Sequence, residues 1–532
     1  MMEKGDPSQK LFTRMQLWEF PDQYVVEPTD GSCGLCLEIS HVDGSVKLID
    51  EVPECSSVRV PKIQKIFGVI GLLKLLAGSY VLVITDRDCV GSYFRHPIFK
   101  VSSMKFFPCV HSLRNSTAEQ KPWKLSLRHF NVAERTPGLY FSYDVKVTLR
   151  LHDLGDESKM LPLWRQADPR FVWNNYMMEV LIDNKVNYLC FHNFQAAIGK
   201  DIIDVTLIAR RCNRRAGTRM WRRGADSDGF VANFEESEQI IQLKGYTASF
   251  VQVRGSIPLL WNQIVDLTHK PKFEIVRIIE AHGGEGRLSE KFANAMQHVT
   301  GDDVRYLHFD FHHICGHVHF ERLSILYDQI EDFFIKNRYF LLNEKGEKVE
   351  LQFGVLRTNC IDCLDRTNVT QSMLGRKMLE FQLRRFGTFD AEETISSHPN
   401  LDESFKLLWA NHGDDISIQY SGTPALKGDF VRYGHRTAQG ILADGCNALM
   451  RYYLNNFVDG TKQDAVDLLQ GHYMLSVSRD MKPSSQKGGI ETKASFPLAL
   501  ALILTGLFFA MLSLRKVALI SGICYMQWFG KA

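Results

Sequence analysis

The stretch Arg357–Asn368, RTNCIDCLDRTN, decides the fold class of this chain. The residues before it, ELQFGVL, are typical of a strand, and Val369, Met373, Leu374 and Met378 follow it at helical spacing. We therefore expect a loop between a strand and a helix, with backbone N–H groups and the positive helix end directed at one spot. Such a loop can surround a phosphate-sized anion, and its setting predicts an α/β fold.

The residue types in this loop match the demands of phosphate-ester hydrolysis. Cys360 at a helix N-terminus is expected to ionise readily, because such positions lower a thiol pKa from near 8.5 to roughly 3.5–7.5. The thiolate would attack phosphorus in line, and Arg366 offers a planar fork of donors for two phosphate oxygens. Thr367 could donate to the thiolate. Asp362 or Asp365 could protonate the leaving alkoxide and later activate water, and the loop sequence leaves both open.

The remaining loop residues are expected to line the bound phosphate. The alternative is that Cys360 and Cys363 are core thiols or half of a zinc site. Zinc would need a second pair nearby, and the other C-x-x-C, Cys33–Cys36, lies more than three hundred residues away. We therefore expect a metal-independent substrate-binding loop that includes Arg357, Asn359, Ile361, Cys363 and Leu364.

The loop resembles the signature of the Sac-domain phosphoinositide phosphatases, a Cys-x5-Arg-Thr family. Three further blocks are similar to the same domain: RRAGTRMWRRGADSDGFVANFEESEQI (214–240), SFVQVRGSIPLLW (249–261) and YSGTPALKGDFVRYGHRT (420–437). The resemblance covers roughly residues 10 to 480. It implies a β-rich N-terminal Sac subdomain joined to a Cys-phosphatase-like catalytic domain, a sheet flanked by helices. It also implies removal of phosphate from inositol lipids, often at position 4, with no cofactor.

The loop pattern C-x-D-x-x-D-R-T is also similar to that of the myotubularins, lipid phosphatases in which an acid inside the loop is thought to serve. That analogy favours Asp365 over Asp362, although the sequence alone does not separate them. Arg254, in the second block, either supports the site or fixes a turn. We include it among the candidate substrate-binding residues.

A run of arginines overlaps the first of these blocks. Seven arginines lie between positions 210 and 223. The ordinary interpretation is a solvated face with ion pairs, but an anionic leaflet attracts nearby cations by about 1 kcal/mol each. We therefore interpret the run as a headgroup or membrane contact, with Arg215 and Arg219 as candidates. Nucleic acid is the lesser alternative, because interleaved aromatics and a known binding fold are lacking.

The string HFDFHHICGH (308–317) supports the main rival mechanism. On a strand, His308, Asp310 and His312 would share one face, as metal-hydrolase ligands do. A complete Cys site exists elsewhere, so we interpret them as supporting or core groups and expect no metal.

Composition sets the broad class of the protein. The chain has 532 residues, 45% of them hydrophobic and 23% charged, with a net charge of +2. These values indicate a globular protein with more than one domain and no global attraction to nucleic acid. Twelve cysteines in such a length do not suggest a disulfide framework. The start has no apolar run typical of a signal peptide, so we expect a cytosolic body with reduced thiols.

Two stretches could be mistaken for membrane spans. Ile66–Ile84 carries Lys74 at its centre, which costs roughly 3 kcal/mol on insertion, so we expect a buried helix, a Gly-Ser break and a strand. Phe496–Leu514 has no charge, and as a helix it would reach about 28 Å, close to the hydrocarbon core. We predict a transmembrane helix there, with the enzyme domain cytosolic.

The predicted organisation follows the chain. The expected parts are an N-terminal Sac subdomain (1–125, ending in a linker at 114–121), a catalytic domain (126–460), a flexible tether (461–495), a transmembrane helix (496–514) and a short tail (515–532). The leading hypothesis is a phosphatase acting on phosphatidylinositol 4-phosphate in the cytosolic leaflet of the endoplasmic reticulum or Golgi. The alternatives are a phosphoprotein phosphatase with the same chemistry and a non-catalytic membrane tether or headgroup-binding scaffold. Protein partners are not indicated.

Overall fold

The computed structural model describes residues 11–472 except 31–34, 43, 55–59, 76–77, 110–128, 154–165, 179–186, 265–271, 276–284 and 317–318. The predicted linker at 114–121, the transmembrane helix and the tail lie outside these residues. No helix in the described part of the chain is long and apolar enough to cross a membrane.

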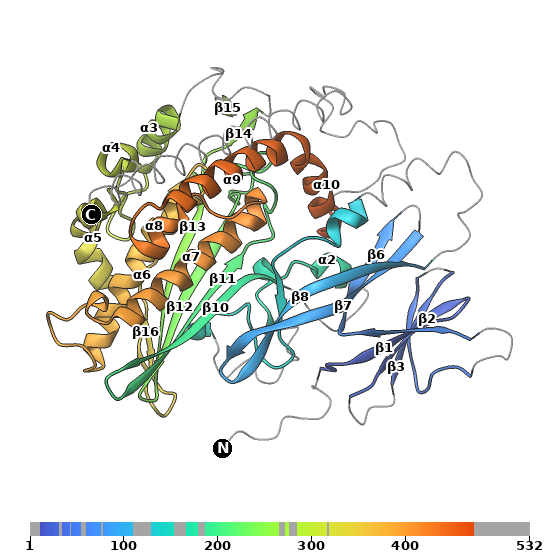
Figure 1. Ribbon diagram of the computed structural model, residues 1–532. Coiled ribbons are helices and arrows are strands. Elements are labelled where there is room, and N and C mark those ends of the chain that lie inside the picture. Colours follow the sequence, from blue (N-terminus) through green and yellow to red (C-terminus); the bar gives the residue numbers. More distant parts are fainter. Residues whose placement is uncertain are drawn as a thin grey trace, which may run out of the picture.

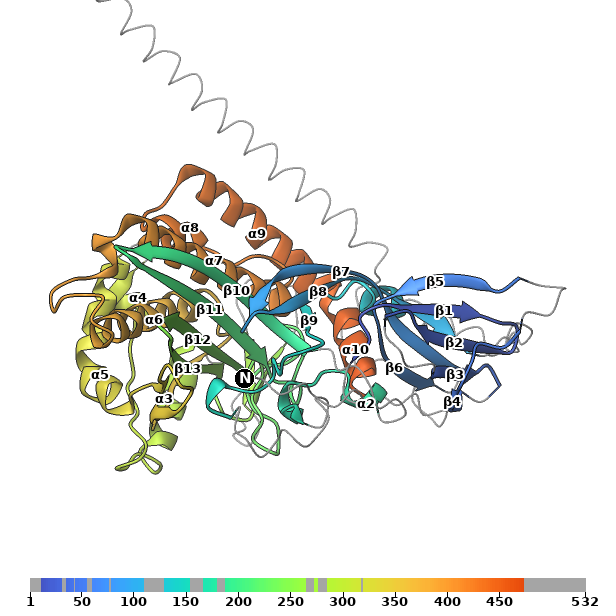
Figure 2. The ribbon, with the colours of Figure 1, turned by 90° about the horizontal axis from the view of Figure 1, so that it is seen from below.

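A small antiparallel sheet forms one end of the molecule (Figure 2). Its five strands run in the order β4-β3-β2-β1-β5. Their bounds are β1 (Met15–Glu19), β2 (Gln23–Pro28), β3 (Cys36–Ser40), β4 (Val46–Ile49) and β5 (Lys62–Ile66). Apolar side chains from its strands meet those of β6 and β7 in one cluster, so the small sheet rests on the large one.

A long mixed sheet forms the body of the protein (Figure 1). It has 11 strands in the order β17-β16-β13-β12-β11-β10-β9-β8-β7-β6, and β18 adds to β13. Their bounds are β6 (Gly68–Leu75), β7 (Gly78–Tyr93), β8 (His96–Pro108), β9 (Leu139–Phe141), β10 (Asn187–Ile198), β11 (Asp201–Arg211), β12 (Glu235–Leu243), β13 (Tyr246–Ser256), β16 (Phe340–Leu342), β17 (Lys348–Glu350) and β18 (Leu356–Cys360). A separate hairpin joins β14 (Trp261–Ile264) to β15 (Lys272–Ile275). The α/β class is as predicted.

Helices cover one face of this sheet. The bounds are α2 (Asn175–Met178), α3 (Glu285–Met296), α4 (Phe311–Cys315), α5 (Leu323–Asn337), α6 (Asp365–Arg385), α7 (Pro399–Ser421), α8 (Gly428–Tyr433), α9 (Ala438–Phe457) and α10 (Asp459–Leu469). The main core lies between the sheet and helices α6 and α7, where Leu207 and Phe250 meet Leu374, Phe405 and Trp409. In Figure 1, α7 and α9 cross in front of the strands.

The apolar stretch Ile66–Ile84 does not contain the predicted helix. It forms most of an antiparallel hairpin, with Leu72 of β6 opposite Val81 of β7. Residues 68–73 of β6 and 79–84 of β7 are buried on both faces, so the apolar side chains of this stretch do not alternate with polar ones. A doubly buried strand of this kind cannot be told from a buried helix by periodicity.

The observed elements also revise the predicted boundaries. Strands β6–β8 and β9–β13 belong to one sheet, so position 125 does not divide two sheets. The flexible tether predicted from residue 461 is wrong at its start, because α10 runs to Leu469. Ala465, Val466 and Leu469 pack in a cluster with Trp173, between α10 and the N-terminal strands.

Candidate active site

The predicted strand–loop–helix arrangement is confirmed. Strand β18 pairs in parallel with β13, which places Ser256 opposite Cys360 at the carboxyl end of both strands. The amide of Ile257 donates to the carbonyl of Cys360 at 3.1 Å. Helix α6 begins at Asp365, so its positive end faces the loop that follows Cys360.

The middle of the loop faces the core. Cys363 has a φ of 53° and is fully buried, and its thiol donates to the carbonyl of Gly255 at 2.8 Å. Burial, with the nearby Cys360 and Asp362, raises the pKa of the Cys363 thiol. Leu364 is likewise buried, against Ile416. The side chains of Cys363 and Leu364 therefore hold the loop in shape, and a contact of these two residues with substrate stays a prediction.

Arg254 holds the loop from behind. It is fully buried on β13, and its Nε donates to Gln371 Oε1 at 2.9 Å, while Nη1 donates to Asn368 Oδ1. Nη1 also lies 3.4 Å from the carbonyl oxygen of Cys363. Arg254 therefore joins β13 to the first turns of α6, which agrees with the supporting interpretation. A contact of Arg254 with substrate stays a prediction.

Asp362 is held as a carboxylate. Its Oδ2 accepts from Arg219 Nε at 3.1 Å and from Arg219 Nη2 at 2.7 Å. Burial alone would raise the pKa of Asp362, but the guanidinium groups of Arg219, Arg223 and Arg366 outweigh it and hold the pKa well below its usual range. Arg219, one of the two arginines predicted to contact substrate, therefore binds a residue of the loop.

Asp365 lies on the other side of the loop. Its Oδ1 accepts from the amide of Leu426 at 2.7 Å, and Oδ2 lies 3.2 Å from Nη1 of the buried Arg451. Lys427, the residue just before α8, interacts electrostatically with Asp365 and Arg366. The block Tyr420–Thr437 therefore meets the loop, although the sequence carries no signal for the Asp365–Arg451 pair.

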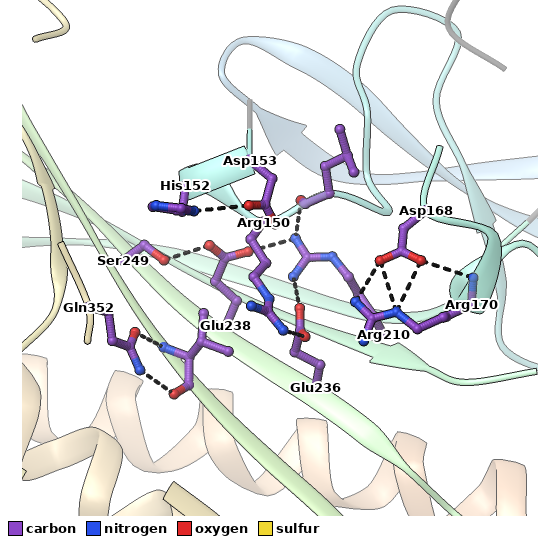
Figure 3. Close-up of polar contacts among 12 residues, drawn as sticks. Arg150, His152, Asp153, Asp168, Arg170, Arg210, Glu236, Glu238, Ser249 and Gln352 are labelled. Atoms are coloured by element: carbon purple, nitrogen blue, oxygen red, sulfur yellow. Dashed lines mark hydrogen bonds and ion pairs between the residues drawn. The ribbon is translucent and has the colours of Figure 1, made fainter. Parts of the chain in front are cut away.

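Most of the arginine run is structural. Arg210 is fully buried on β11, where its Nη2 lies 2.6 Å from Glu238 Oε2 and its Nη1 lies 3.5 Å from Glu236 Oε1. Figure 3 shows Arg150 and Arg210 directed at these two glutamates, with the Asp168–Arg170 pair nearby. The interpretation of the run as a headgroup or membrane contact is therefore wrong at Arg210, whose guanidinium pairs with two buried glutamates. Arg211 and Arg223 are buried as well.

Arg215 also makes a local contact. Its Nη2 donates to the carbonyl of Arg223 at 2.7 Å, and its Nε donates to that of Gly224 at 3.2 Å. The described contacts of Arg215 thus fix the chain between β11 and β12. A role of Arg215 in substrate binding stays a prediction.

A cavity of about 620 Å³ opens on the nucleophile side of the loop. Part of its lining is polar and comes from Arg357, Asn359, Cys360, Arg366 and Thr367. Another part is apolar and comes from Phe292, Met296, Tyr306, Leu307, Phe309 and Phe311. The cavity therefore places an apolar wall beside the residues predicted to act on phosphate.

Besides Cys360 and Arg366, four of the predicted site residues line this cavity, which are Arg357, Asn359, Ile361 and Thr367. Arg357 donates from Nε to Asn359 Oδ1 at 2.8 Å, and Ile361 packs with Trp261. The hydroxyl oxygen of Thr367 is buried and has no hydrogen-bond partner among the described residues. A hydroxyl in this state is available to a group that enters the cavity.

The strand face that the rival metal site would need is not formed. The segment around His308 and Asp310 is not a strand, and α4 begins at Phe311, so no shared strand face exists. Within the part of the chain that the structure describes, no group of three or more His, Cys, Asp or Glu side chains could hold a metal ion. His308 lines the cavity beside the loop.

The fold and the site define an α/β protein with a cysteine-phosphatase type of loop. Residues 67–282 match the SacI homology domain. The chain is 65% identical over 546 residues to phosphoinositide phosphatase SAC6 of Arabidopsis thaliana, which covers 96% of this chain and 92% of that protein. It is 65% identical over 552 residues to phosphoinositide phosphatase SAC7 of the same plant, covering 97% and 92%.

More distant animal relatives match over most of their length as well. Phosphatidylinositol-3-phosphatase SAC1-A of Danio rerio is 33% identical over 512 residues, covering 89% of this chain and 86% of that protein. The chain therefore belongs to the Sac-domain family of phosphoinositide phosphatases, as its motifs predicted.

Proposed function

We propose that the protein hydrolyses a phosphate monoester of an inositol lipid, phosphatidylinositol 4-phosphate, through a phosphocysteine on Cys360. The observation that carries this proposal is the cavity of about 620 Å³ that joins the loop to an apolar wall. A polar, anion-binding end suits the phosphate, and the apolar lining suits the less polar part of a lipid headgroup and its glycerol.

The first step transfers phosphoryl to sulfur. The Cys360 thiolate forms an S–P bond as the P–O bond to inositol breaks, and Arg366 with the loop amides follows the charge on the equatorial oxygens. Asp365 gives its proton to the leaving alkoxide. The arginines around Asp362 lower its pKa and disfavour a proton on it, so we assign the role to Asp365.

The second step releases phosphate. Water attacks phosphorus, the S–P bond breaks, and inorganic phosphate leaves as the thiolate is restored. Asp365 takes the proton from the attacking water. The buried Thr367 hydroxyl, which has no hydrogen-bond partner among the described residues, would donate to the sulfur while the sulfur carries negative charge.

We further infer that Phe496–Leu514 anchors the catalytic body to the cytosolic face of a membrane of the endoplasmic reticulum or Golgi. The uncharged sequence supports this inference. The anchor would keep the enzyme next to its lipid, which favours a lipid substrate over a phosphoprotein.

The test is a panel of phosphoinositide monophosphates in vesicles, assayed for phosphate release with excess chelator present. We expect the 4-phosphate to be the best substrate and Cys360→Ser to be inactive while folded. The animal relatives are named as 3-phosphatases. A preference of this protein for the 3-phosphate would refute the proposed specificity for the 4-phosphate. Turnover by folded Cys360→Ser would refute the phosphocysteine, and rescue of a chelated enzyme by a divalent ion would favour a metal mechanism.

A further inference from the structure

Arg223 lies directly beside the nucleophile loop, in the segment between β11 and β12. The next residue, Gly224, donates its amide to Ser256 Oγ at 3.0 Å, and that hydroxyl donates to the carbonyl of Ile361 at 3.0 Å. Two hydrogen bonds thus connect the backbone after Arg223 with the residue after Cys360.

The backbone at this point is closely fitted. Gly224 has a φ of 61°, and a Cβ there would lie 2.5 Å from the carbonyl oxygen of Trp261. Only glycine avoids both the left-handed strain and this backbone clash. Together with the two carbonyl contacts from Arg215, this fit fixes where the Arg223 side chain starts.

The Arg223 guanidinium is buried with few partners. Only 4% of the residue is exposed, and its Nε donates to the carbonyl of Arg219 at 2.9 Å. Its guanidinium carbon lies 6.0 Å from the centre of the Trp261 ring. Among the described residues, no acceptor or carboxylate lies within bonding distance of its two terminal nitrogens, which is costly for a buried cation.

Several charged groups surround Arg223. Asp362 is paired with Arg219 at 2.7 Å, and Arg223 interacts electrostatically with both Asp362 and Cys360. Burial, followed by repulsion from Arg219, lowers the pKa of Arg223, while Tyr420, Asp362 and Cys360 oppose this shift. A phosphate dianion would supply the missing negative charge and the missing acceptors.

We propose that Arg223 is a second phosphate-binding guanidinium, which grips the phosphoryl group together with Arg366. This inference rests on the proposed function, since it places the phosphate at Cys360. The competing role is structural: Arg223 would only hold the Arg219 carbonyl, and so act through Asp362.

The test measures phosphate binding without lipid turnover. Inorganic phosphate should protect Cys360 from alkylation by iodoacetamide, followed by mass spectrometry of the peptide that contains Cys360. In Arg223→Met we expect half-protection to need about 10- to 100-fold more phosphate, as for loss of a hydrogen bond to a charged group. Arg223→Lys should give an intermediate value, because it keeps the charge and loses the fork.

The matched control is Arg222→Met. Arg222 pairs with Asp467 at 2.8 Å on α10, away from the loop, and its loss should leave protection unchanged. Thermal melting followed by circular dichroism checks that each variant is folded. If Arg223→Met does not fold, the comparison is made with Arg223→Lys.

The outcomes separate this inference from the proposed function. Unchanged phosphate protection in folded Arg223→Met or Arg223→Lys would overturn the inference, even if lipid hydrolysis fell. Failure of phosphate to protect Cys360 in the unmodified protein would overturn both. Normal lipid turnover by Cys360→Ser, with phosphate binding still dependent on Arg223, would refute only the phosphocysteine mechanism.

Discussion

The two loop aspartates should respond differently to replacement by asparagine. We expect Asp365→Asn to slow phosphoryl transfer from the lipid by about 10²- to 10⁴-fold, the usual contribution of a general acid. The inositol alkoxide is a strongly basic leaving group, whereas an aryl phosphate leaves without a proton. Transfer from an aryl phosphate should therefore fall by less than about tenfold in the same variant.

Asp362→Asn should instead weaken the fold and affect both substrates equally. The carboxylate accepts two hydrogen bonds from Arg219, at 2.7 and 3.1 Å, and an amide oxygen accepts them without the charge. The difference between charged and neutral hydrogen bonds predicts a loss of about 1–2 kcal/mol in the free energy of unfolding. Because the folded pKa of Asp362 is lowered, its stabilisation is present above the unfolded pKa of about 4 and fades as the pH falls below it. The stability gap between the wild type and Asp362→Asn should therefore narrow below about pH 4.

The kinetic assay is single-turnover phosphoryl transfer to the enzyme, because the later attack of water is common to both substrates. Urea unfolding at several pH values provides the stability measurement. Selectivity in the opposite sense would give the acid role to Asp362. Equal losses for both variants on both substrates would show that the proton donor lies outside the loop.

Two further predictions concern the body of the protein and its anchor. Arg210→Met should lower the free energy of unfolding by about 3–5 kcal/mol in urea, because it leaves Glu238 buried without its cation, whereas Glu236 keeps Arg150. Changing the exposed Arg214, whose guanidinium lies 4.5 Å from the Phe230 ring, to Met should cost less than about 1 kcal/mol. Equal losses would contradict the buried pair. Deletion of Phe496–Ala532 should move the protein from the membrane pellet to the supernatant with turnover of a soluble substrate retained, whereas deletion from Asp459 should also remove α10 and lower the melting temperature; a shortened protein that stays in the pellet would place the anchor elsewhere.

The parts of the site that the sequence predicted are local in the chain. Cys360, Arg366 and the start of α6 fall within one short motif, whose strand-like and helix-like flanks are visible in the letters themselves. The partners of the loop are not local: Arg451 reaches Asp365, and Arg219 reaches Asp362, only because the sheet and α9 bring them there. The sequence offered no means of telling which of the seven arginines between positions 210 and 223 would contact the loop.

The errors have a common physical cause. Buried polar residues and doubly buried strands obey tertiary contacts and not the amphipathic periodicity on which sequence interpretation depends. Arg210 looked like surface charge because its two glutamates lie on a neighbouring strand. In the same way, the strand Gly68–Leu75 looked helical because both of its faces are covered.

The continuous large sheet has a consequence for how the protein can be divided. A chain that began at residue 126 would lose β6–β8 and expose the hydrogen-bonding groups of β9, which pairs with β8 at Phe99 and Lys100. Bare strand edges recruit other chains, so such a fragment should aggregate and not yield an independent enzyme. Strands β6–β8 thus cover the edge of the sheet at β9. They are part of the catalytic body and could not readily be exchanged as a separate module.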